Sequence, residues 1–431
     1  MSRRLTIAAL AGCLLLPGAA GAQAPAAASR SMARVTFDEA VRLAVTRNPD
    51  VESAAAAILR AEGLLRQAHA VVLPNVEVSG THTTLDDSRG LGGQEFTPRN
   101  TVTAALSLSM PIVAAADWAR RVQAEDTRQV ARAGAGEVRR QVGLAAADAY
   151  LAVFARRRVV EAQVRARDTA KAFYDYAHQR LVAGAGSRLN ELRALQTLSS
   201  TEALVQDAEL ALYRAQEALG IVVAADGPVD VSNEPVFEVP QKEAVIADAD
   251  SVIEQRADIG LLNRRTSAAQ RVVSDSWKDY LPSVVGIFQP QYQRPASLVT
   301  PETSWRALFQ FSVPVFDSGF RRGLKIERQA LLQETEAARA GQRRAARSEI
   351  RAAYESVERS ARALASTRAA ADQATEVLRI TDISFRTGAT TNIEVIDAQR
   401  RALDADTAVA VSEDQLRRAR LDLLAAVGRF P

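Results

Sequence analysis

The chain has 431 residues, of which 24% are charged, 47% hydrophobic and only 5% aromatic, and its formal net charge is +3. Because the net positive charge is small and no Lys/Arg block alternates with aromatic residues, composition disfavours a nucleic-acid-binding protein. Alanine, arginine, glutamate and glutamine fill long stretches, so most of the chain is predicted to be helical.

The first 22 residues have the pattern of a secretory signal peptide. Arg3 and Arg4 precede an apolar run that reaches Leu16, and small residues end the segment at Ala22. Cys13 lies inside this segment, in a Leu-Ala-Gly-Cys motif that also resembles a lipoprotein cleavage site. We favour the ordinary signal because the apolar run continues past Cys13, and lipidation at Cys13 is the alternative.

Outside the signal segment no run of about 18 apolar residues occurs, so the sequence predicts no membrane-spanning helix. The mature chain would contain no cysteine, hence no disulfide. An exported chain of this kind is expected in the periplasm, in the outer membrane or outside the cell.

The first half of the chain begins with an Ala/Pro/Ser-rich stretch at residues 23–35, which we expect to be flexible. A helix is predicted over residues 36–71, with a capping box formed by Thr36 and Glu39 and an interruption at Pro49. Strand-like alternation follows in residues 75–85.

A loop rich in glycine and charge is predicted at residues 86–100. Residues 101–110 alternate with period two, and we expect Pro111 to end that strand. Residues 117–183 contain no proline and would form a helix about 100 Å long. After a turn with Ser187 as N-cap, a return helix is expected over residues 188–219.

The second half repeats this order after a Pro/Gly-rich connector at residues 221–243. A helix is predicted over residues 243–279, then two strands around a loop at residues 294–303, then a second helix near 100 Å at residues 318–387. Gly388 turns the chain, and a final helix ends near Val427.

Matching segments recur at a nearly fixed offset in the two halves. Leu-Pro pairs begin at Leu73 and Leu281, which are 208 residues apart (281 − 73). The turn glycines Gly184 and Gly388 are 204 apart (388 − 184), and we also match Gly220 with Gly428. Such similarity predicts two copies of one structural unit. We therefore divide the mature chain into a first repeat at 23–220, the connector at 221–243 and a second repeat at 244–431.

The predicted strands admit two interpretations. They could form a soluble sheet packed on helices, or they could face lipid with apolar residues out and polar residues in. The aromatic residues on one face, Phe309 and Phe311 among them, favour lipid contact in an exported chain. Four strands cannot close a barrel, and open edges are not tolerated in lipid, so this interpretation requires an oligomer.

The chain resembles the TolC family of outer-membrane efflux proteins. The most specific segment runs from Phe385 to Gly428, beginning "FRTGATTNIEVIDAQ" and ending "LLAAVG". Members of the family have here an Arg-x-Gly turn, a short acidic-aliphatic stretch, Asp-Ala-Gln, and a helix ending in Leu-x-x-x-x-Gly. The export signal and the duplication agree with the resemblance, which covers essentially the whole mature chain.

The resemblance implies a mainly α fold with small β content, in which two structural repeats carry long α-hairpins. In a homotrimer, four strands per protomer would build a twelve-stranded β-barrel in outer-membrane lipid, and the α-hairpins would form a periplasmic α-barrel. This conduit would be the passive exit duct of a tripartite efflux or type I secretion system. It would work with a periplasmic adaptor protein and an inner-membrane transporter, and the sequence leaves the cargo open.

Two acidic residues after the second turn are the candidate gate. Glu394 and Asp397 lie three residues apart and so share a helical face. The resemblance implies that such acids line the narrow periplasmic end, where a ring of carboxylates favours cations. Some family members place an arginine shortly after the turn glycine, but this chain has Thr390 there. The first turn offers Arg188 and Asn190 instead, so the locking of the closed state stays open.

The two turns are the candidate tips that contact the adaptor. They contain small or hydroxyl side chains, and glycine permits close approach of another backbone. A helical hairpin needs glycine to turn in any case. The tip residues are Gly184, Ala185, Gly186, Ser187, Gly388, Ala389 and Thr390.

No catalytic or metal-binding constellation is evident, so we expect neither enzymatic activity nor a cofactor. His69, His82 and His178 are far apart and lack the partner spacing of a zinc site. The mature methionines, Met32 and Met110, are too few for a methionine-based copper relay. The alternative function from another class is a periplasmic helical scaffold with small sheets and no pore.

Overall fold

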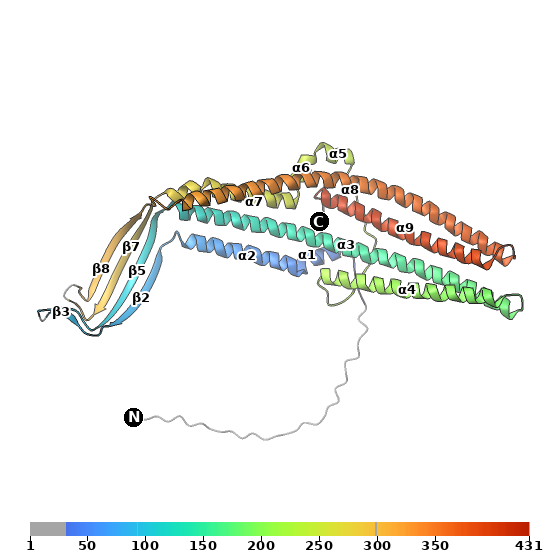
Figure 1. Cartoon of the computed structure of the whole chain (residues 1–431), viewed down its shortest axis with the longest axis horizontal. Helices are drawn as coiled ribbons and strands as arrows, with labels where there is room; N and C mark the ends of the chain where they lie inside the picture. The colour runs from blue at the N-terminus through green and yellow to red at the C-terminus, as the bar shows by residue number, and fades with distance from the viewer. Residues whose placement is uncertain (1–31, 93, 298–299, 431) are drawn as a thin grey trace, which may run out of the picture.

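The protein is elongated, with a β-sheet at one end and the turns of two long α-hairpins at the other (Figure 1). The computed structural model describes residues 32–92, 94–297 and 300–430. The predicted signal segment, with Cys13, lies outside these residues. None of the helices in the described residues combines the length and apolar composition needed to cross a lipid bilayer.

The elements of the first half follow the predicted order closely. They are β1 (Ala33–Val35), α1 (Phe37–Arg47), α2 (Pro49–Ala70), β2 (Asn75–Thr84), β3 (Arg89–Leu91), β4 (Gln94–Thr97), β5 (Asn100–Ala114), α3 (Ala115–Val182) and α4 (Arg188–Val222). The predicted cap at Thr36 is confirmed, because its Oγ1 accepts a hydrogen bond from the Glu39 N–H at 3.3 Å. Pro49 occupies the first turn of α2, as its missing N–H allows.

The second half contains more and shorter helices than predicted before its strands. Its elements are β6 (Val229–Val231), α5 (Lys242–Ala247), α6 (Ala249–Glu254), α7 (Ala257–Ser274), the 3₁₀ helix η1 (Ser276–Tyr280), β7 (Ser283–Arg294), β8 (Thr303–Ser312), α8 (Phe320–Arg386) and α9 (Asn392–Ala426). The prediction of one helix over residues 243–279 is therefore wrong. The chain breaks at Asp248 and at Arg256, whose extended backbone directs its side chain into contacts with Asp258 and Ala426.

Pro111 does not end its strand, contrary to the prediction. Strand β5 continues to Ala114. The pairing of β2 with β5 stops at Ser109, so the strand beyond it has only β7 as a neighbour. The pairing with β7 also shifts between Pro111 and Val113. A proline is tolerated at such a one-sided, irregular position because few ladder hydrogen bonds are lost there.

Two segments expected to lack regular structure contain short strands. The loop at residues 86–100 includes the antiparallel pair β3 and β4, with Gly92 at φ 64° between them. The start of the chain and the connector pair with each other, because β1 runs parallel to β6 from Ala33↔Val229 to Val35↔Val231. This pairing ties the connector to the first repeat.

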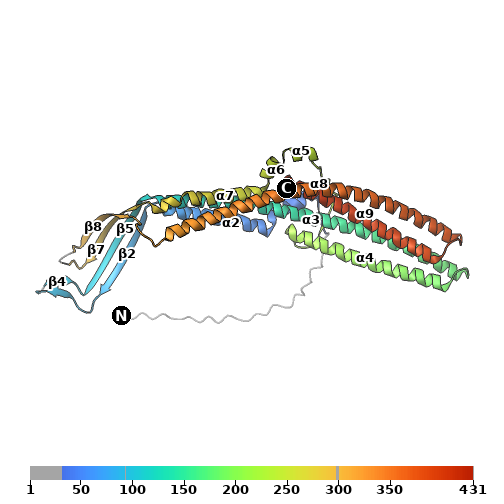
Figure 2. The ribbon, with the colours of Figure 1, turned by 45° about the horizontal axis from the view of Figure 1, so that its top comes forward.

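The main sheet has the strand order β2-β5-β7-β8 and is antiparallel throughout. Its central pair, β5 with β7, joins the two repeats. Helices α3 and α8 are 68 and 67 residues long, and each returns through a shorter helix, α4 or α9. The two hairpins run side by side away from the sheet in both views (Figures 1 and 2).

The best-buried part of the molecule is its middle, where α1, α3, α4 and β6 meet. Tyr150 of α3 is fully buried among apolar neighbours that include Val153, Leu219 and Val231. Its hydroxyl donates to the Asn233 carbonyl at 2.7 Å, which satisfies the one polar atom that the ring brings into the core. The long helix α3 is thus packed against α1, α4 and β6 by a local hydrophobic core near the middle of its length.

The C-terminal ends of α4 and α9 correct one element of the repeat alignment. Gly428 has φ 74°, and the residue with the same role after α4 is Ala224, at φ 54°. The equivalent hydrogen bonds are Ala225 N–H to Gly220 O and Arg429 N–H to Leu424 O, both 2.9 Å. Gly220 lies inside α4 and so is equivalent to Leu424, not to Gly428. Its buried position leaves no room for a side chain, because a Cβ there would collide with the Gly227 carbonyl.

We expect Ala224→Gly to stabilise the protein by about 1 kcal/mol, because a non-glycine residue in left-handed conformation is strained. Chemical denaturation followed by circular dichroism measures the change. The matched control is Gly428→Ala, which places the same strain at the equivalent position and should destabilise. A loss of stability in Ala224→Gly would contradict the assigned strain.

Candidate functional site

The strand pairing places apolar residues from all four strands on one face of the sheet. Val78 lies opposite Leu106, Leu108 opposite Phe288, and Pro290 opposite Trp305. Since side chains alternate along a strand, every second residue joins this face. Its members include Val76, Val78, Val102, Ala104, Leu106, Leu108, Met110, Val284, Phe288, Tyr292, Trp305, Phe309 and Phe311.

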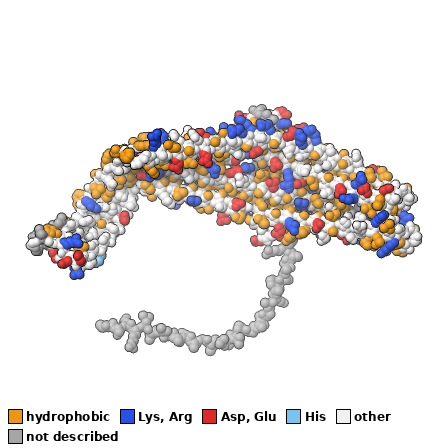
Figure 3. Space-filling view, in the orientation of Figure 1, with side chains coloured by type: hydrophobic (Ala, Val, Ile, Leu, Met, Phe, Trp, Pro, Cys, Tyr) orange, Lys and Arg blue, Asp and Glu red, His pale blue; other side chains and the backbone are white. Residues whose placement is uncertain are grey.

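This apolar face has no covering element within the described chain, and its side chains are exposed apart from that of Val284, which is half-buried. The exposed fractions of Val78, Trp305 and Phe309 are 76%, 70% and 77%. In the view of Figure 3, hydrophobic side chains gather over the end of the sheet that joins the helices, whereas charged side chains are scattered over the helices. A contiguous exposed apolar face marks a surface covered by lipid or by another protein.

The opposite face of the sheet is mainly polar. Glu77 pairs with Ser107, and Gln289 pairs with Arg306, so these four residues form one row across the sheet. Arg306 donates to Gln289 Oε1 at 2.6 Å, and Gln289 donates to Ser107 Oγ at 3.1 Å. A sheet with one apolar and one hydrogen-bonded polar face is suited to separating lipid from water.

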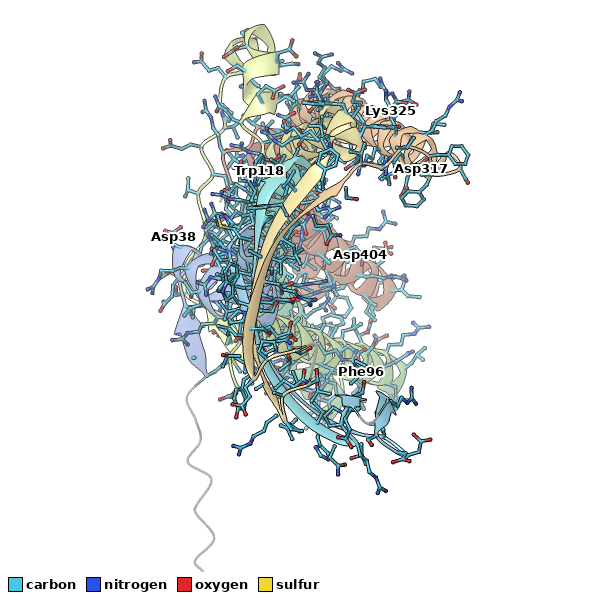
Figure 4. All side chains as sticks on the ribbon, turned by 90° about the vertical axis from the view of Figure 1, so that its left-hand side faces the viewer. Asp38, Phe96, Trp118, Asp317, Lys325 and Asp404 are labelled. Atoms are coloured by element: carbon cyan, nitrogen blue, oxygen red, sulfur yellow. The ribbon has the colours of Figure 1, made fainter. Side chains whose placement is uncertain are left out.

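Among the residues that the structure describes, both edges of the sheet are unpaired. β2 pairs only with β5, and β8 pairs only with β7. Seen from the sheet end, the strands form a curved layer (Figure 4). A curved sheet with two free edges is incomplete by itself, because exposed edges readily pair with further strands.

The two turns at the other end of the molecule share one backbone geometry. Gly184 and Gly388 have φ angles of 72° and 84°. The Ala185 N–H donates to Arg180 O at 2.9 Å, and the Ala389 N–H donates to Ser384 O at 2.7 Å. This is the helix-ending motif in which glycine adopts the left-handed conformation that other residues avoid. Ser187 is confirmed as the N-cap of α4, because its Oγ accepts from the Leu189 N–H at 3.2 Å.

The two turns differ two residues after these glycines. A Cβ on Gly186 would lie 2.7 Å from the Leu181 nitrogen, so the first turn requires glycine there. The equivalent residue in the second turn is Thr390, whose buried Oγ1 has no hydrogen-bond partner among the described residues. The two turns therefore differ locally at this position, where the first requires glycine and the second holds a hydroxyl side chain.

Glu394 and Asp397 lie together on an exposed face in the first two turns of α9. Val395 and Ala398, beside them, are 0% and 4% exposed and anchor the opposite face of the helix. The carboxylate of Asp397 pairs with Arg401 at 2.8 Å on the same helix. Glu394 has no ion-pair partner within the residues described, so it holds the uncompensated charge of the two.

An aromatic cluster near the turns joins the two hairpins. Phe385 of α8 packs on Phe173 and Tyr176 of α3, with ring centroids 5.3 and 6.1 Å apart. The guanidinium carbons of Arg386 and Arg180 lie 5.1 and 5.9 Å from the Tyr176 ring centre. Aromatic pairs and cation–π contacts each contribute of order 0.5–1.5 kcal/mol, so this cluster fixes the hairpins to each other.

Two polar contacts at this end were not foreseen from the sequence. The side-chain N–H of Asn392, a buried residue of α9, donates to the Asn190 carbonyl of α4 at 3.0 Å. Glu191 is also buried and accepts hydrogen bonds from His178, at 2.6 Å, and from Arg188. The bond from His178 is the largest cause that lowers the pKa of Glu191, and Arg188 adds to it against the effect of burial. The offset of 204 could have revealed the asymmetry, since Val395 replaces Glu191 in the second copy.

Comparison with known proteins gives one family and a set of similar folds. The profile of the family described as "Outer membrane efflux protein" matches residues 40–223 and 249–429. No curated protein sequence matched the chain. The solved structures are similar at low sequence identity.

Three of these structures illustrate the similarity. The CmeC outer membrane channel of Campylobacter jejuni is 17% identical over 91% of this chain and 86% of its own, with a TM-score of 0.79. The outer membrane protein VceC of Vibrio cholerae is 19% identical over 91% and 96%, with a TM-score of 0.77. The open state of the Neisseria gonorrhoeae MtrE channel is 16% identical over 92% and 90%, with a TM-score of 0.77.

Proposed function

The chain belongs to the outer membrane efflux protein family and is an outer-membrane exit duct that extends into the periplasm, and we propose that it works as a gated homotrimer. Its partners in this proposal are a periplasmic adaptor protein and an inner-membrane transporter, which supplies the energy. The duct itself is passive, because the residues proposed to act in it bind and exclude ions but carry out no reaction.

The incomplete sheet is the observation that carries the proposal. Its exposed apolar face is suited to contact with lipid. Its two free edges, β2 and β8, are suited to pairing with further strands. Three copies of four strands make a closed twelve-stranded barrel, which leaves no edge in the membrane. The polar face with Glu77 and Arg306 then lines the pore. A pore-free periplasmic scaffold would leave the apolar face in water, so the sheet favours the duct.

Glu394 and Asp397 are the proposed periplasmic gate. In a homotrimer each residue occurs three times around the axis, and like charges at close range repel one another while attracting cations. The pairing of Asp397 with Arg401 supports Glu394 as the residue that contributes most to the charge of the ring. Thr390 is uncharged, so the hydrogen bond between Asn392 and Asn190 is the candidate lock in place of an arginine.

The two turns are the proposed contact with the adaptor. The tip residues are Gly184, Ala185, Gly186, Ser187, Gly388, Ala389 and Thr390, and they form the end of the molecule farthest from the sheet (Figure 1). Small side chains there allow the backbone of a partner to approach closely.

Purified protein in a planar lipid bilayer tests the proposal, with its mass in detergent measured in parallel. We expect three copies per particle and stepwise conductance. A stable monomer, or no conductance under any voltage, salt or gate substitution, would leave the scaffold function instead. Single-cysteine probes such as Ser187→Cys can then capture the adaptor in cells, and failure across several tip positions would count against docking there.

A further inference from the structure

The polar face of the sheet carries very little charge. At its positions in β2, β5, β7 and β8 the charged residues are Glu77 and Arg306, and the others are mainly serine, threonine, asparagine and glutamine, with a few small or apolar residues. Ile287 and Leu308 pair with each other directly beside the pair of Gln289 and Arg306. Arg306 is therefore a cation on a neutral and partly apolar surface.

The exposure pattern of β5 indicates that the sheet curves towards this polar face. The polar-face residues of β5, from Thr101 to Ser109, are half-buried, whereas its apolar-face residues, from Val102 to Met110, are exposed. Side chains on the inside of a curved sheet crowd one another and lose exposure, while those on the outside spread apart. The polar face is thus the inner surface of the curved layer, and in the proposed homotrimer it surrounds the pore.

A relay of hydrogen bonds orients the side chain of Arg306. Its Nε donates to Gln289 Oε1 at 2.6 Å, and Gln289 donates in turn to Ser107 Oγ at 3.1 Å. The Arg306 side chain therefore leans towards β7 and β5, away from the free edge of β8. Arg306 is exposed, and it has no ion-pair partner among the residues that the structure describes. Its positive charge is thus held in place and left uncompensated within one copy.

Glu77, at the other end of the same row, is too far away to neutralise Arg306. The two residues are three strand intervals apart, which is about 14 Å. Strands in a barrel tilt by about 35–45°, so the row climbs and its two ends differ in height by about 8–10 Å. A rotation axis keeps Glu77 of every copy at one height and Arg306 of every copy at another. The homotrimer would therefore carry two separate rings, one acidic and one basic.

We propose that Arg306 forms a cationic ring inside the barrel, which attracts anions and makes this end of the duct selective in the opposite sense to the acidic gate at the far end. The ring rests on the proposed homotrimer and adds a second specificity-determining residue to it. Guanidinium groups bind carboxylates and phosphates through paired N–H donors. Because Nε is bound to Gln289, the terminal amino groups of Arg306, which contact no other described acceptor, are the donors for such oxyanions. The apolar pair of Ile287 and Leu308 beside it strengthens the attraction by lowering the local dielectric constant.

Reversal potentials in a salt gradient across a planar bilayer test the ring. Arg306→Gln removes three positive charges per trimer, and we expect the cation-to-anion permeability ratio to rise roughly two- to threefold, most clearly at low ionic strength. Arg306→Lys keeps the charge and should leave the ratio close to that of the parent. Glu77→Gln is the matched control of opposite sign, and it should lower the ratio.

Inorganic pyrophosphate is the probe for anion binding at the ring. Its several negative charges should hold it at the three guanidinium groups and reduce the current through the parent trimer at low salt. We expect the concentration that halves the current to be roughly fivefold higher for Arg306→Gln than for the parent. Equal concentrations in the two proteins would show that the anion binds elsewhere and would count against the ring.

A cysteine variant tests the charge within one folded protein. The chain has no cysteine besides Cys13, so Arg306→Cys introduces a single thiol outside the predicted signal segment. A methanethiosulfonate reagent that carries a trimethylammonium group should restore the parent permeability ratio, and one that carries a sulfonate should raise the ratio above that of Arg306→Gln, with labelling verified by mass spectrometry. Identical ratios after the two reagents, or an unchanged ratio in Arg306→Gln, would overturn the ring and leave the duct intact. A parent chain that forms no trimer or no conducting pore would instead refute the proposed function.

Discussion

Glu394→Gln is expected to form trimers that conduct as well as the parent but with a weaker preference for cations. A carboxylate and a monovalent cation about 4 Å apart attract each other by about 1 kcal/mol in water. Removing the three Glu394 carboxylates of a trimer should therefore lower the cation-to-anion permeability ratio roughly three- to tenfold. Because exposed charges are screened by salt, the change should be largest at low ionic strength. The substitution also removes the mutual repulsion of three glutamates, which raises the free energy of the gate when it is narrow.

Asp397→Asn is the matched comparison for this prediction. Its carboxylate is already neutralised by Arg401 on the same helix, and both side chains are more than half exposed. An exposed ion pair between residues four apart on one helix contributes little to the electric field at the pore or to the stability of the protein. We therefore expect a smaller shift in reversal potential for Asp397→Asn than for Glu394→Gln. Reversal potentials in a salt gradient across a planar bilayer measure both.

The comparison separates three outcomes. Equal shifts in the two variants would mean that Arg401 turns away from Asp397 in the trimer. No shift in either variant, with normal conductance, would place the selective ring elsewhere, and the row that contains Glu77 and Arg306 in the sheet would be the next candidate. A reduced permeability ratio in Glu394→Gln alone supports the assignment.

Arg256→Ala should be among the most destabilising single substitutions in the chain, at about 3–5 kcal/mol, the usual cost of removing one partner of a buried ion pair. The side chain of Arg256 is 7% exposed, and that of Asp258 is 14% exposed. Arg256 donates to Asp258 Oδ2 at 2.8 Å, to Glu349 at 2.8 Å and to the Ala426 carbonyl at 3.0 Å. Its loss leaves the Asp258 carboxylate without its cationic partner and removes the Arg256 donor from the Ala426 carbonyl at the end of α9.

The pH dependence of stability gives this prediction a second readout. Burial by itself raises the pKa of Asp258, but hydrogen bonds from Arg256 and Gln342 outweigh it and hold that pKa below its usual value. A lowered carboxyl pKa contributes stability above the unfolded value of about 3.9, and this contribution is lost as the pH falls through the folded pKa. Without Arg256 the largest cause that lowers the pKa of Asp258 is lost, so acid unfolding should begin at a higher pH.

Arg347→Ala is the control for Arg256→Ala. Arg347 pairs with Asp250, but the two side chains are 50% and 80% exposed, so the expected cost is within about 1 kcal/mol. Urea unfolding followed by circular dichroism, repeated from neutral to acid pH, measures both variants. Equal losses in the two variants would show that Arg256 is not a buried anchor.

The contacts of Arg256 also show how the repeats diverged while keeping one architecture. Arg256 precedes α7 and binds the Ala426 carbonyl at the end of α9. Its equivalent in the first repeat is Asn48, which precedes α2 and donates to the Val222 carbonyl at the end of α4, also at 3.0 Å. The same junction is made by an uncharged residue in one copy and by a buried ion network in the other.

Local pattern was sufficient for most elements. Helical periodicity, the Thr36 cap and the turn glycines Gly184 and Gly388 predicted the hairpins, because each signal depends on residues a few positions apart. Pro111 was wrongly predicted to end its strand. A strand tolerates proline there because β2 has already ended, and the residues next to Pro111 in the sequence do not reveal where β2 ends. The break at Arg256 was missed because a residue 170 positions away fixes it.

The site divides in the same way. The acidic pair Glu394 and Asp397, the tip residues and the alternating strands are visible in the sequence, since helix and strand periods decide which side chains share a face. Only the tertiary structure shows that Asp397 is neutralised by Arg401, that Asn392 reaches Asn190, and that Glu191 is enclosed by His178 and Arg188. Side-chain orientation and long-range contact cannot be obtained from spacing alone.

The sequence by itself determined that this chain is two copies of a strand-and-hairpin unit, because repetition and period are local properties of the amino-acid order. The tertiary structure decided how the copies join. Pairing of β5 with β7 puts every apolar strand face on one side and leaves β2, β8, α2 and α8 as open edges. That arrangement depends on the alignment of residues about two hundred positions apart, and it makes the protomer a part of a larger assembly.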